Sequence, residues 1–480
     1  MNIKYIAASL LAGTMMMTSC ADFTEIDPKG KNLLSTTADL ELLLNAEYSI
    51  SPTEMQEVCG DVIYSVDPIA TKLTPTVKTK FSILVGWDEE GHDNELPQLT
   101  ASDSYYANCY EYIGRIANPI LSKIDDAEGP EAERLAIKAE AYVIRAYFHY
   151  LVIQKFAPAY DKATAANTIG LSYVKEDQDI KQPTVPVSLE EYYANIIADI
   201  DAALSLNALP EMPLNRMRFG LACAYAVKAH ALMAMQEPAR AAIEAQNALD
   251  INSTVANYNN MLVDTPDMMG ISTFKTIVRK KLECVEDYFT TDDINFFTPY
   301  PTWDMMENGH AVRDYFNTMN KAYAPMGMDP SLLMLGVPGY TMTYDLTSSW
   351  PTISLSTPQM YLILAENAIN NSRYDDAMGY LDAIRANRIN PDVYTPLQGT
   401  VNDKATAIQW LKTTAHGEGL FSVWNFINRK RWSRLDDYKE TLTRTVCDIE
   451  MSLTPDSKMW VFPIPQNVIN NNPNFTPYLN

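Results

Sequence analysis

The feature that most restricts the fold is a long, alanine-rich segment, residues 131–157, which reads EAERLAIKAEAYVIRAYFHYLVIQKFA. From Ala141 to Ile153 its residues are apolar on nearly every face of a helix, and such a helix is stable only when other elements cover it. Pro158 follows directly and is expected to end the helix, because proline cannot continue the hydrogen-bond ladder. The segment therefore predicts a buried helix around which a mostly helical chain packs.

Two polar residues lie inside this segment. Arg145 and His149 are four residues apart, so they share one face of the helix. A charged or imidazole side chain is tolerated in a core when its polar atoms are hydrogen-bonded there. We therefore interpret both as satisfied polar groups of the interior, and the five histidines of the chain have no metal-ligand spacing.

Further helices are indicated on both sides of the centre of the chain. Residues 188–207 open with Ser188 in a helix-capping position and Glu191 three residues later, which is the pattern of a capping box. Two closely spaced pairs of helical segments follow, and each pair predicts an antiparallel hairpin. The paired segments are 218–236 with 238–251 and 357–371 with 373–388.

Small residues at fixed positions indicate the kind of hairpin. In tetratricopeptide repeats (TPRs), small side chains let two helices pack closely, with large ones between them. The pattern is matched in the second pair by Tyr361, Leu364, Ala365, Ala377 and Leu381, and less fully in the first by Tyr225, Ala229, Ala241 and Ala248. The sequence thus predicts a mostly α fold, a degenerate TPR-like helical-hairpin scaffold that is interrupted between the pairs by a loop-rich, aromatic-rich insertion. Ordinary helical hairpins are the alternative.

The interruption is rich in aromatic residues. Residues 286–351 lose helical periodicity and contain twelve Phe, Tyr or Trp residues, nearly double the fraction in the whole chain. Aromatic side chains on the loops of a rigid scaffold offer flat faces to ring-shaped ligands such as sugars. The alternative for any one of the twelve is that it anchors its loop to the scaffold. We take four as candidate ligand-binding residues: Tyr300, Trp303, Tyr340 and Trp350.

A further candidate lies before the long helix. The segment 85–112 combines aromatic and acidic residues, and Trp87 stands beside Asp88. We predict a loop here, with Trp87 as the fifth ligand-binding candidate and a purely solvated loop as the alternative. The acids do not have the spacing of an EF-hand calcium loop. We predict no metal site and no cofactor.

The N-terminus is typical of an exported protein. Residues 1–19 carry one charge, Lys4, and an apolar stretch too short to span a bilayer as a stable helix. Small residues lead into Cys20, and MTSC looks like a lipobox, the signal for diacylation of the cysteine in bacterial lipoproteins. We expect removal of 1–19 and lipidation of Cys20; an ordinary signal peptide with a chance cysteine is the alternative. The other five cysteines are scattered, so no disulfide framework is expected.

Charge and missing motifs restrict the function. The net charge is −23, and removal of residues 1–19 takes away one lysine and no acid, giving −24. This balance opposes binding to nucleic acid, so the basic run 428–434 is better interpreted as a helix end paired with internal acids. The sequence has no H-E-x-x-H, G-x-S-x-G, P-loop or G-x-G-x-x-G motif. These absences remove the common catalytic motifs, but two suitably spaced carboxylates are enough for glycoside hydrolysis, so that activity stays open at this point.

Four segments, spread from one end of the chain to the other, together carry a family pattern. They are CADFTEIDPKG (20–30), AEAYVIRAYFHYLVIQKFAPAYD (139–161), MYLILAENAINNSRYDDAMGYLDAIRANR (360–388) and MWVFPIPQNVINNNPNFTPYLN (459–480). They resemble, in that order, the mature start, the A-E-x-x-x-x-R-A-x-x-Y-x-x-L helix, the later helical pair and the terminal P-I-P and Asn-rich signature of the SusD/RagB family of outer-membrane nutrient-binding lipoproteins.

This resemblance implies a function at the cell surface. In the family, a TPR scaffold caps a SusC-like, TonB-dependent β-barrel transporter, and oligosaccharide is bound between the two by irregular loops. The acids that follow Cys20 resemble the signal that sends such lipoproteins to the outer face of the outer membrane. The resemblance therefore implies a lipid-anchored, surface-facing protein that captures oligosaccharide and is not an enzyme. A peptide is the alternative cargo, and a surface glycoside hydrolase is a further alternative.

The patterns divide the chain into four parts. They are a lipoprotein signal peptide (1–19), an N-terminal SusD-like part with TPR-like helices (20–257), a loop-rich ligand-face insertion (258–355), and a C-terminal part with the second helical pair and the P-I-P and Asn-rich segment (356–480). The insertion is the part expected to contact the ligand.

Overall fold

The structure is a computed structural model of the chain. It describes residues 34–59, 69–179, 181–266, 273–280, 283–291, 298–300, 306–313, 341–343 and 352–479. The expected signal peptide and lipidation site, Cys20, lie outside the described residues, as do Trp303, Tyr340 and Trp350.

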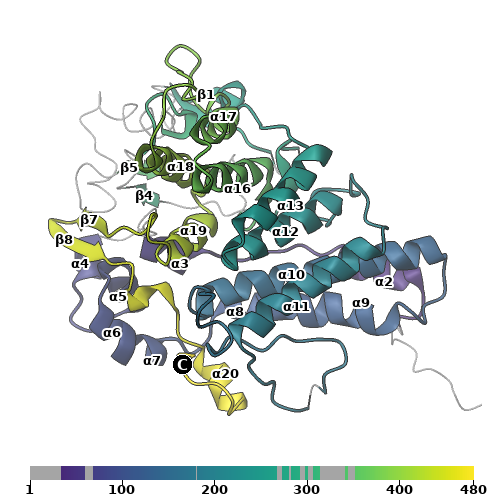
Figure 1. Ribbon diagram of the computed structural model, residues 1–480. Coiled ribbons are helices and arrows are strands. Elements are labelled where there is room, and N and C mark those ends of the chain that lie inside the picture. The colour runs from purple at the N-terminus through teal and green to yellow at the C-terminus, as the bar shows by residue number, and fades with distance from the viewer. Residues whose placement is uncertain are drawn as a thin grey trace, which may run out of the picture.

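Seven long helices of the described chain stack so that each packs on the one before it in sequence (Figure 1). They are α10 (Glu131–Phe156), α11 (Leu189–Ser205), α12 (Leu221–Ala234), α13 (Pro238–Ile251), α16 (Thr357–Asn370), α17 (Tyr374–Arg385) and α18 (Lys404–Glu418). The buried helix and both hairpins expected from the sequence are therefore confirmed. Ser188 caps α11, because its side chain accepts a hydrogen bond from the Glu191 amide at 3.2 Å.

The stack is continuous where the sequence is interrupted. α13 ends at Ile251 and α16 begins at Thr357, yet the two helices pack directly against each other. The second hairpin thus continues the array of the first. The scaffold is interrupted along the chain and unbroken in space.

Alanines lie at the helix contacts that the TPR-like pattern identified. Ala229 and Ala241 of the first hairpin, and Ala365 and Ala377 of the second, have no exposed surface. Their small side chains allow the close approach of α12 to α13 and of α16 to α17.

We expect Ala365→Leu to lower the free energy of unfolding by about 1–3 kcal/mol, because extra methylene groups in a filled contact force neighbouring side chains out of their rotamers. Urea unfolding followed by circular dichroism measures the change. Ala405→Leu, at an exposed position of α18, is the control and should change stability little. Equal losses in the two variants would contradict the close-packed role of Ala365.

Short helices occupy the chain before α10. They are α2 (Thr37–Leu44), α3 (Thr53–Cys59), α4 (Ile69–Leu73), α5 (Lys80–Gly86), α6 (Glu89–Asn94), α7 (Leu96–Leu99), α8 (Ser104–Tyr112), the π-helix η1 (Ile113–Ala117) and α9 (Asn118–Lys123). The prediction of a loop over 85–112 was therefore wrong. Two of its acids are helix caps: Asp88 accepts from the Gly91 amide at 3.0 Å, and Asp103 from the Tyr106 amide at 2.9 Å.

The described strands form four two-stranded antiparallel sheets. The pairs are β1 (Leu262–Pro266) with β2 (Thr273–Ile277), β3 (Asp287–Phe289) with β6 (Leu355–Ser356), β4 (Thr298–Tyr300) with β5 (Thr341–Thr343), and β7 (Leu442–Val446) with β8 (Ile449–Leu453). The remaining elements are the 3₁₀ helices η2 (Tyr258–Met261) and η5 (Lys458–Trp460), and the helices α19 (Trp424–Trp432) and α20 (Gln466–Asn471). Pairing of β3 with β6 brings the chain after α13 back to the start of α16.

The polar residues of α10 are satisfied inside the core, as expected. Arg145 donates to both carboxylate oxygens of Asp199 at 2.7 Å. His149 bonds the Arg145 carbonyl through Nδ1 at 2.9 Å, and its Nε2 accepts from the Val174 amide at 2.9 Å. Earlier on the same helix, Glu140 accepts two hydrogen bonds from Arg218 at 2.6 and 2.7 Å. The charged residues of the A-E-x-x-x-x-R motif therefore fix α10 to its neighbours.

The basic run 428–434 behaves as a helix end bound to the interior. Arg431 forms a two-pronged ion pair with Glu366 at 2.6 Å, which confirms the predicted pairing with internal acids. Lys430 differs, because its ammonium donates at 2.5–2.6 Å to the carbonyls of Gln154 and Ala157 at the C-terminal end of α10. The helix dipole places negative charge at that end, but burial lowers the pKa of Lys430 well below its usual value, so the cost of desolvation outweighs this attraction.

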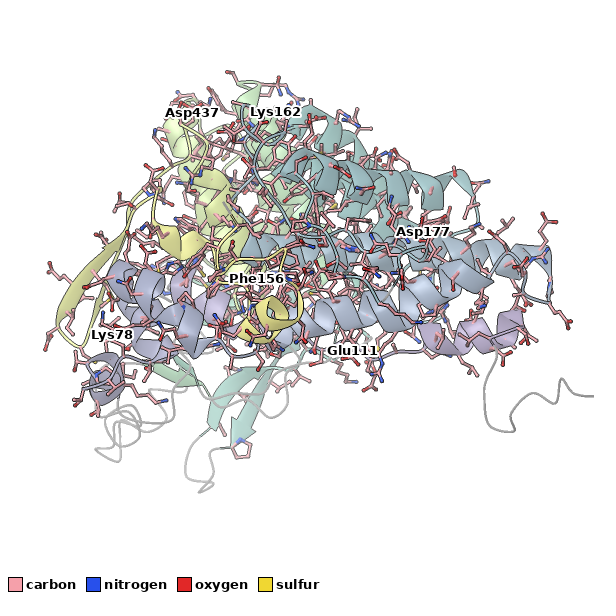
Figure 2. All side chains as sticks on the ribbon, turned by 90° about the horizontal axis from the view of Figure 1, so that it is seen from below. Lys78, Glu111, Phe156, Lys162, Asp177 and Asp437 are labelled. Atoms are coloured by element: carbon pink, nitrogen blue, oxygen red, sulfur yellow. The ribbon has the colours of Figure 1, made fainter. Side chains whose placement is uncertain are left out.

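The C-terminal segment also meets the end of α10. Figure 2 shows Phe156 beneath this yellow segment, and the Phe462 amide donates to the Lys155 carbonyl at 3.0 Å. Further on, Pro465 precedes α20, and the Asn472 side chain donates to the Thr184 carbonyl at 2.9 Å. The P-I-P and Asn-rich signature thus fastens the chain end to the scaffold.

Two observations complete the fold. The five described cysteines form no disulfide, and Cys223 is buried in α12 with 1% of its surface exposed, as expected for a small residue in a helix interface. Among the described residues, no helix combines the length and the apolar content needed to cross a bilayer.

Candidate functional site

Arg388, three residues after the end of α17, joins the aromatic-rich insertion to the helical stack. Its guanidinium donates to both oxygens of Glu418 on α18, at 2.7 and 2.9 Å, and to Glu286 just before β3, at 2.7 Å. It also lies 3.7 Å from the centre of the Tyr258 ring. Only 1% of Arg388 is exposed. One buried cation therefore binds two points in the first third of the insertion, Tyr258 and Glu286, to the C-terminal half of the scaffold.

Glu286 is held in this position by more than the arginine. Its carboxylate accepts from the Tyr258 hydroxyl at 3.1 Å and from the Ala256 amide at 3.0 Å. Burial would raise the pKa of Glu286, but Arg388 and Arg279 bring that pKa below its usual range. Glu286 is therefore an ionised, fully bonded partner of the guanidinium.

A second contact lies one helical turn earlier. Arg385 donates to Glu307 at 2.5 and 2.9 Å, and the Asn390 amide donates to the Gly309 carbonyl at 2.7 Å. Gly309 has a φ of 76°, a backbone conformation that glycine adopts without strain. The segment 306–313 is thus fixed along the end of α17.

A group of possible metal ligands lies at the same base. Cys284, Glu286 and Asp287 place one ligand atom each within 4.8 Å of one another. Both carboxylates are already bound to arginines, Glu286 to Arg388 and Asp287 to Arg279. Burial raises the pKa of Asp287 to about 6 despite that ion pair. Both carboxylates of the group are therefore engaged by arginines in this structure.

The five candidate residues are placed very differently. In the β4–β5 ladder Tyr300 pairs with Thr341, so residues 41 apart in sequence come together in the backbone. The side-chain surroundings of Tyr300 lie outside the described structure, and Trp303, Tyr340 and Trp350 lie outside the described residues. Their contact with ligand stays a prediction.

Trp87 is an interior residue at the end of α5. Only 7% of it is exposed, and its indole Nε1 donates to the Val58 carbonyl at 2.7 Å. The guanidinium of Arg444, from β7, covers its ring at 4.1 Å and donates to the Glu57 carbonyl at 3.1 Å. The indole therefore joins α3, α5 and the β7–β8 hairpin. A ligand contact by Trp87 stays a prediction, now for a side chain that is almost wholly covered.

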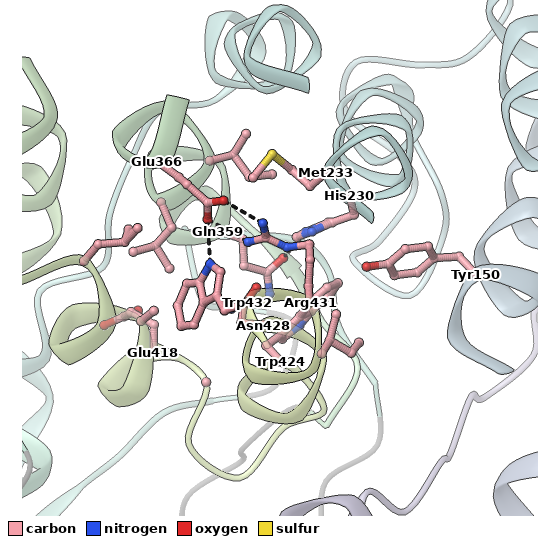
Figure 3. Close-up of a pocket in the computed structure, with 16 residues that line it drawn as sticks. Tyr150, His230, Met233, Gln359, Glu366, Glu418, Trp424, Asn428, Arg431 and Trp432 are labelled. Carbon is pink, nitrogen blue, oxygen red and sulfur yellow. Dashed lines mark hydrogen bonds and ion pairs between the residues drawn. The ribbon is translucent and has the colours of Figure 1, made fainter. Parts of the chain in front are cut away.

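A cavity between α10, α12, α16 and α19 is lined by aromatic and polar groups (Figure 3). His230 stacks on Trp424 with ring centres 4.0 Å apart, and Glu366 accepts from Arg431 and from the Trp432 indole at 2.6 and 3.0 Å. The cavity has a volume of about 30 Å³, which fits about one or two water molecules and no sugar ring. It belongs to the packing of α19 inside the stack.

Sequence reasoning missed the anchoring residues. Arg388 and Glu286 are 102 positions apart and meet only in the folded chain. The available signal was the presence of two arginines, Arg385 and Arg388, at the end of an amphipathic helix, where each needs a buried acid if it is covered.

Residues 23–232 match the SusD-like_3 family, described as starch-binding and associating with the outer membrane. No curated protein matches the chain. Among solved structures, the chain resembles a SusD-like carbohydrate binding protein from Bacteroides vulgatus, with a TM-score of 0.62 and 14% identity over 92% of this chain and 97% of that one.

Two structures from Bacteroides thetaiotaomicron are similar to the same degree. One is a SusD superfamily protein, with a TM-score of 0.62 and 15% identity over 92% of this chain and 99% of that one. The other is surface glycan-binding protein A, with a TM-score of 0.62 and 13% identity over 93% of this chain and 99% of that one. At such identities the likeness establishes the fold, a TPR-containing helical fold shared over nearly the whole chain. The family match covers residues 23–232, and the structural likeness shows the SusD-like fold over nearly the whole chain.

Proposed function

We propose that this protein is a surface lipoprotein that binds oligosaccharide and delivers it to a SusC-like, TonB-dependent transporter of the outer membrane. The observation that carries the proposal is the SusD-like fold shared with a carbohydrate-binding and a surface glycan-binding protein. The aromatic-rich insertion supports it, because Arg388 and Arg385 fix parts of that insertion to a rigid stack. A rigid base lowers the entropic cost of presenting loops to a ligand.

Binding without hydrolysis is part of this proposal. Calorimetric titration of the mature chain carrying Cys20→Ser, against plant, host and microbial oligosaccharides and against oligopeptides, tests it. Saturable binding of one glycan class, with no new reducing ends, is the expected result. Binding of peptides alone would assign the chain to peptide import, and glycan cleavage would make it a hydrolase.

We expect Trp303→Ala or Trp350→Ala to weaken glycan binding by about 1–2 kcal/mol, or roughly five- to thirtyfold, because a stacked ring loses its partner face. Titration with the glycan found in the first experiment measures the change. Tyr374→Ala, at the start of α17 and outside the insertion, is the control and should bind normally. Unchanged affinity in both tryptophan variants would remove these residues from the site.

A further inference from the structure

A groove lies at the end of the molecule formed by α2. It has a volume of about 510 Å³ and is lined by α2, the first half of α10 and the segment 210–218. Figure 1 shows α2 at the far right, whereas α4, α6 and the β7–β8 hairpin lie at the far left. We call this feature the α2 groove. Its volume is within the range of about 300–1,000 Å³ typical of binding sites.

Large apolar side chains that face solvent line the α2 groove or lie within two residues, along the sequence, of its lining. Leu214, which lines it, is 81% exposed, and Met212, two residues earlier, is 75% exposed. Leu42, on the α2 helix beside the lining residue Glu41, is 65% exposed. Single exposed apolar residues are common, but a group of large ones around a concavity is typical of an interaction surface.

The floor of the α2 groove is polar and rigid. Arg218 bonds Glu140 at 2.6 and 2.7 Å and Glu41 at 2.7 Å. The Thr37 hydroxyl donates to Glu133 at 2.8 Å. These contacts join α2, α10 and the segment 210–218, so the shape of the floor is set before anything binds.

The charge of the α2 groove is negative. Its lining includes Glu41, Glu133 and Glu140 against one basic residue, Arg218, and Glu211 is exposed at its rim. A groove with this charge attracts cationic groups. Among the residues that the structure describes, no aromatic side chain lines it, so the described lining lacks the flat faces on which sugar rings stack.

We propose that the α2 groove is a docking site for a protein partner whose contacting segment combines apolar side chains with lysine or arginine. The apolar residues of the partner cover Met212 and Leu214, and its basic residues face Glu133 and Glu211. An anionic lipid surface is disfavoured by the same acids. The α2 groove lies at the opposite end of the scaffold from α4, α6 and the β7–β8 hairpin. The docking proposal does not depend on the glycan-binding proposal.

Model peptides test the docking site on the full mature chain carrying Cys20→Ser. Labelled peptides of alternating leucine and lysine, serine and lysine, or leucine and glutamate are titrated by fluorescence anisotropy. Saturable binding of the leucine–lysine peptide is expected, with slowed amide exchange in α2 and around 210–218. The variant Met212→Ser/Leu214→Ser removes only exposed side chains and should weaken this binding at least tenfold, whereas Ile243→Ser, 61% exposed on α13, should not.

Three results would overturn the proposal. They are equal binding by the double variant, equal binding of the serine–lysine peptide, and binding of phosphatidylethanolamine–phosphatidylglycerol vesicles that depends on Met212 and Leu214. Glycan titration of the same variants separates the two proposals, because normal glycan binding is expected in each variant whatever happens to peptide binding.

Discussion

Replacing Arg388 by methionine is expected to lower the free energy of unfolding by about 3–5 kcal/mol. The substitution leaves Glu286 and Glu418 facing each other inside the protein without their shared cation, and both side chains are less than a tenth exposed. An unpaired buried carboxylate costs its full desolvation energy, which methionine cannot offset. The loss should be accompanied by faster amide exchange at 256–258 and 286–289, because Arg388 holds these segments.

A matched arginine supplies the control. Arg373 pairs with Asp376 at 3.1 Å, but both side chains are about half exposed, at 51% and 52%. Arg373→Met should therefore cost less than about 1 kcal/mol. Urea unfolding of both variants, with exchange measured by mass spectrometry, gives the comparison. A small effect of Arg388→Met, with unchanged exchange in the insertion, would show that other contacts hold the loops in place.

The sequence predicted the helices that arise from a residue pattern within a single segment. The all-round apolar pattern of 131–157 predicts α10 with the correct ends to within one residue, and the small residues of the two hairpins predict their packing. The sequence alone also predicted that Arg145 and His149 are hydrogen-bonded inside the core, because a buried polar group almost always has a hydrogen-bond partner.

What depends on contacts between distant residues could not be predicted in the same way. The packing of α13 on α16 brings together two helices that the whole insertion separates in sequence. The residue pattern of neither helix indicates which other helix it packs against. The region 85–112 was misinterpreted for a different reason. Acidic residues are common both in solvated loops and at helix N-termini, so the sequence fits either structure. The hydrogen bonds of Asp88 and Asp103 show that these two acids cap helices. Trp87 is covered by Arg444, a residue from the far end of the chain.

Acid is expected to unfold this protein steeply, and the cause is a set of buried histidines. Burial lowers the pKa of His149, His230 and His310 to about 3. In the unfolded chain a histidine titrates near about 6.5. As the pH falls from about 6.5 towards 3, the three histidines therefore become protonated in the unfolded chain but stay neutral in the native protein. Stability is lost as the pH falls, by about 1.4 kcal/mol per pH unit for each histidine.

Two buried acids oppose this trend at higher pH. Burial raises the pKa of Glu57 to about 8 and that of Asp287 to about 6. Between their unfolded values and these native values, the native state holds protons that the unfolded chain releases. Their contribution to stability therefore falls as the pH rises through this range. Between about pH 4.5 and 6 they partly cancel the histidines. Below about pH 3.9, the unfolded pKa of aspartate, both acids become largely protonated in both states, and the loss of about 4 kcal/mol per pH unit from the three histidines is then unopposed.

Unfolding by urea at a series of pH values from about 3 to 7 tests this expectation, with a shallow dependence above about pH 5 and a steep one below about pH 3.9. His230→Gln identifies the source, because glutamine can still donate to Gln359, the partner of His230 at 3.2 Å, but takes up no proton. This variant should lose stability in acid by about 1.4 kcal/mol less per pH unit than the parent chain. Arg373→Met, whose exposed side chain stays charged throughout in the parent, should keep the parent slope. If His230→Gln also keeps the parent slope, the steep loss of stability in acid comes from carboxylates in ion pairs and not from a neutral imidazole buried in the core.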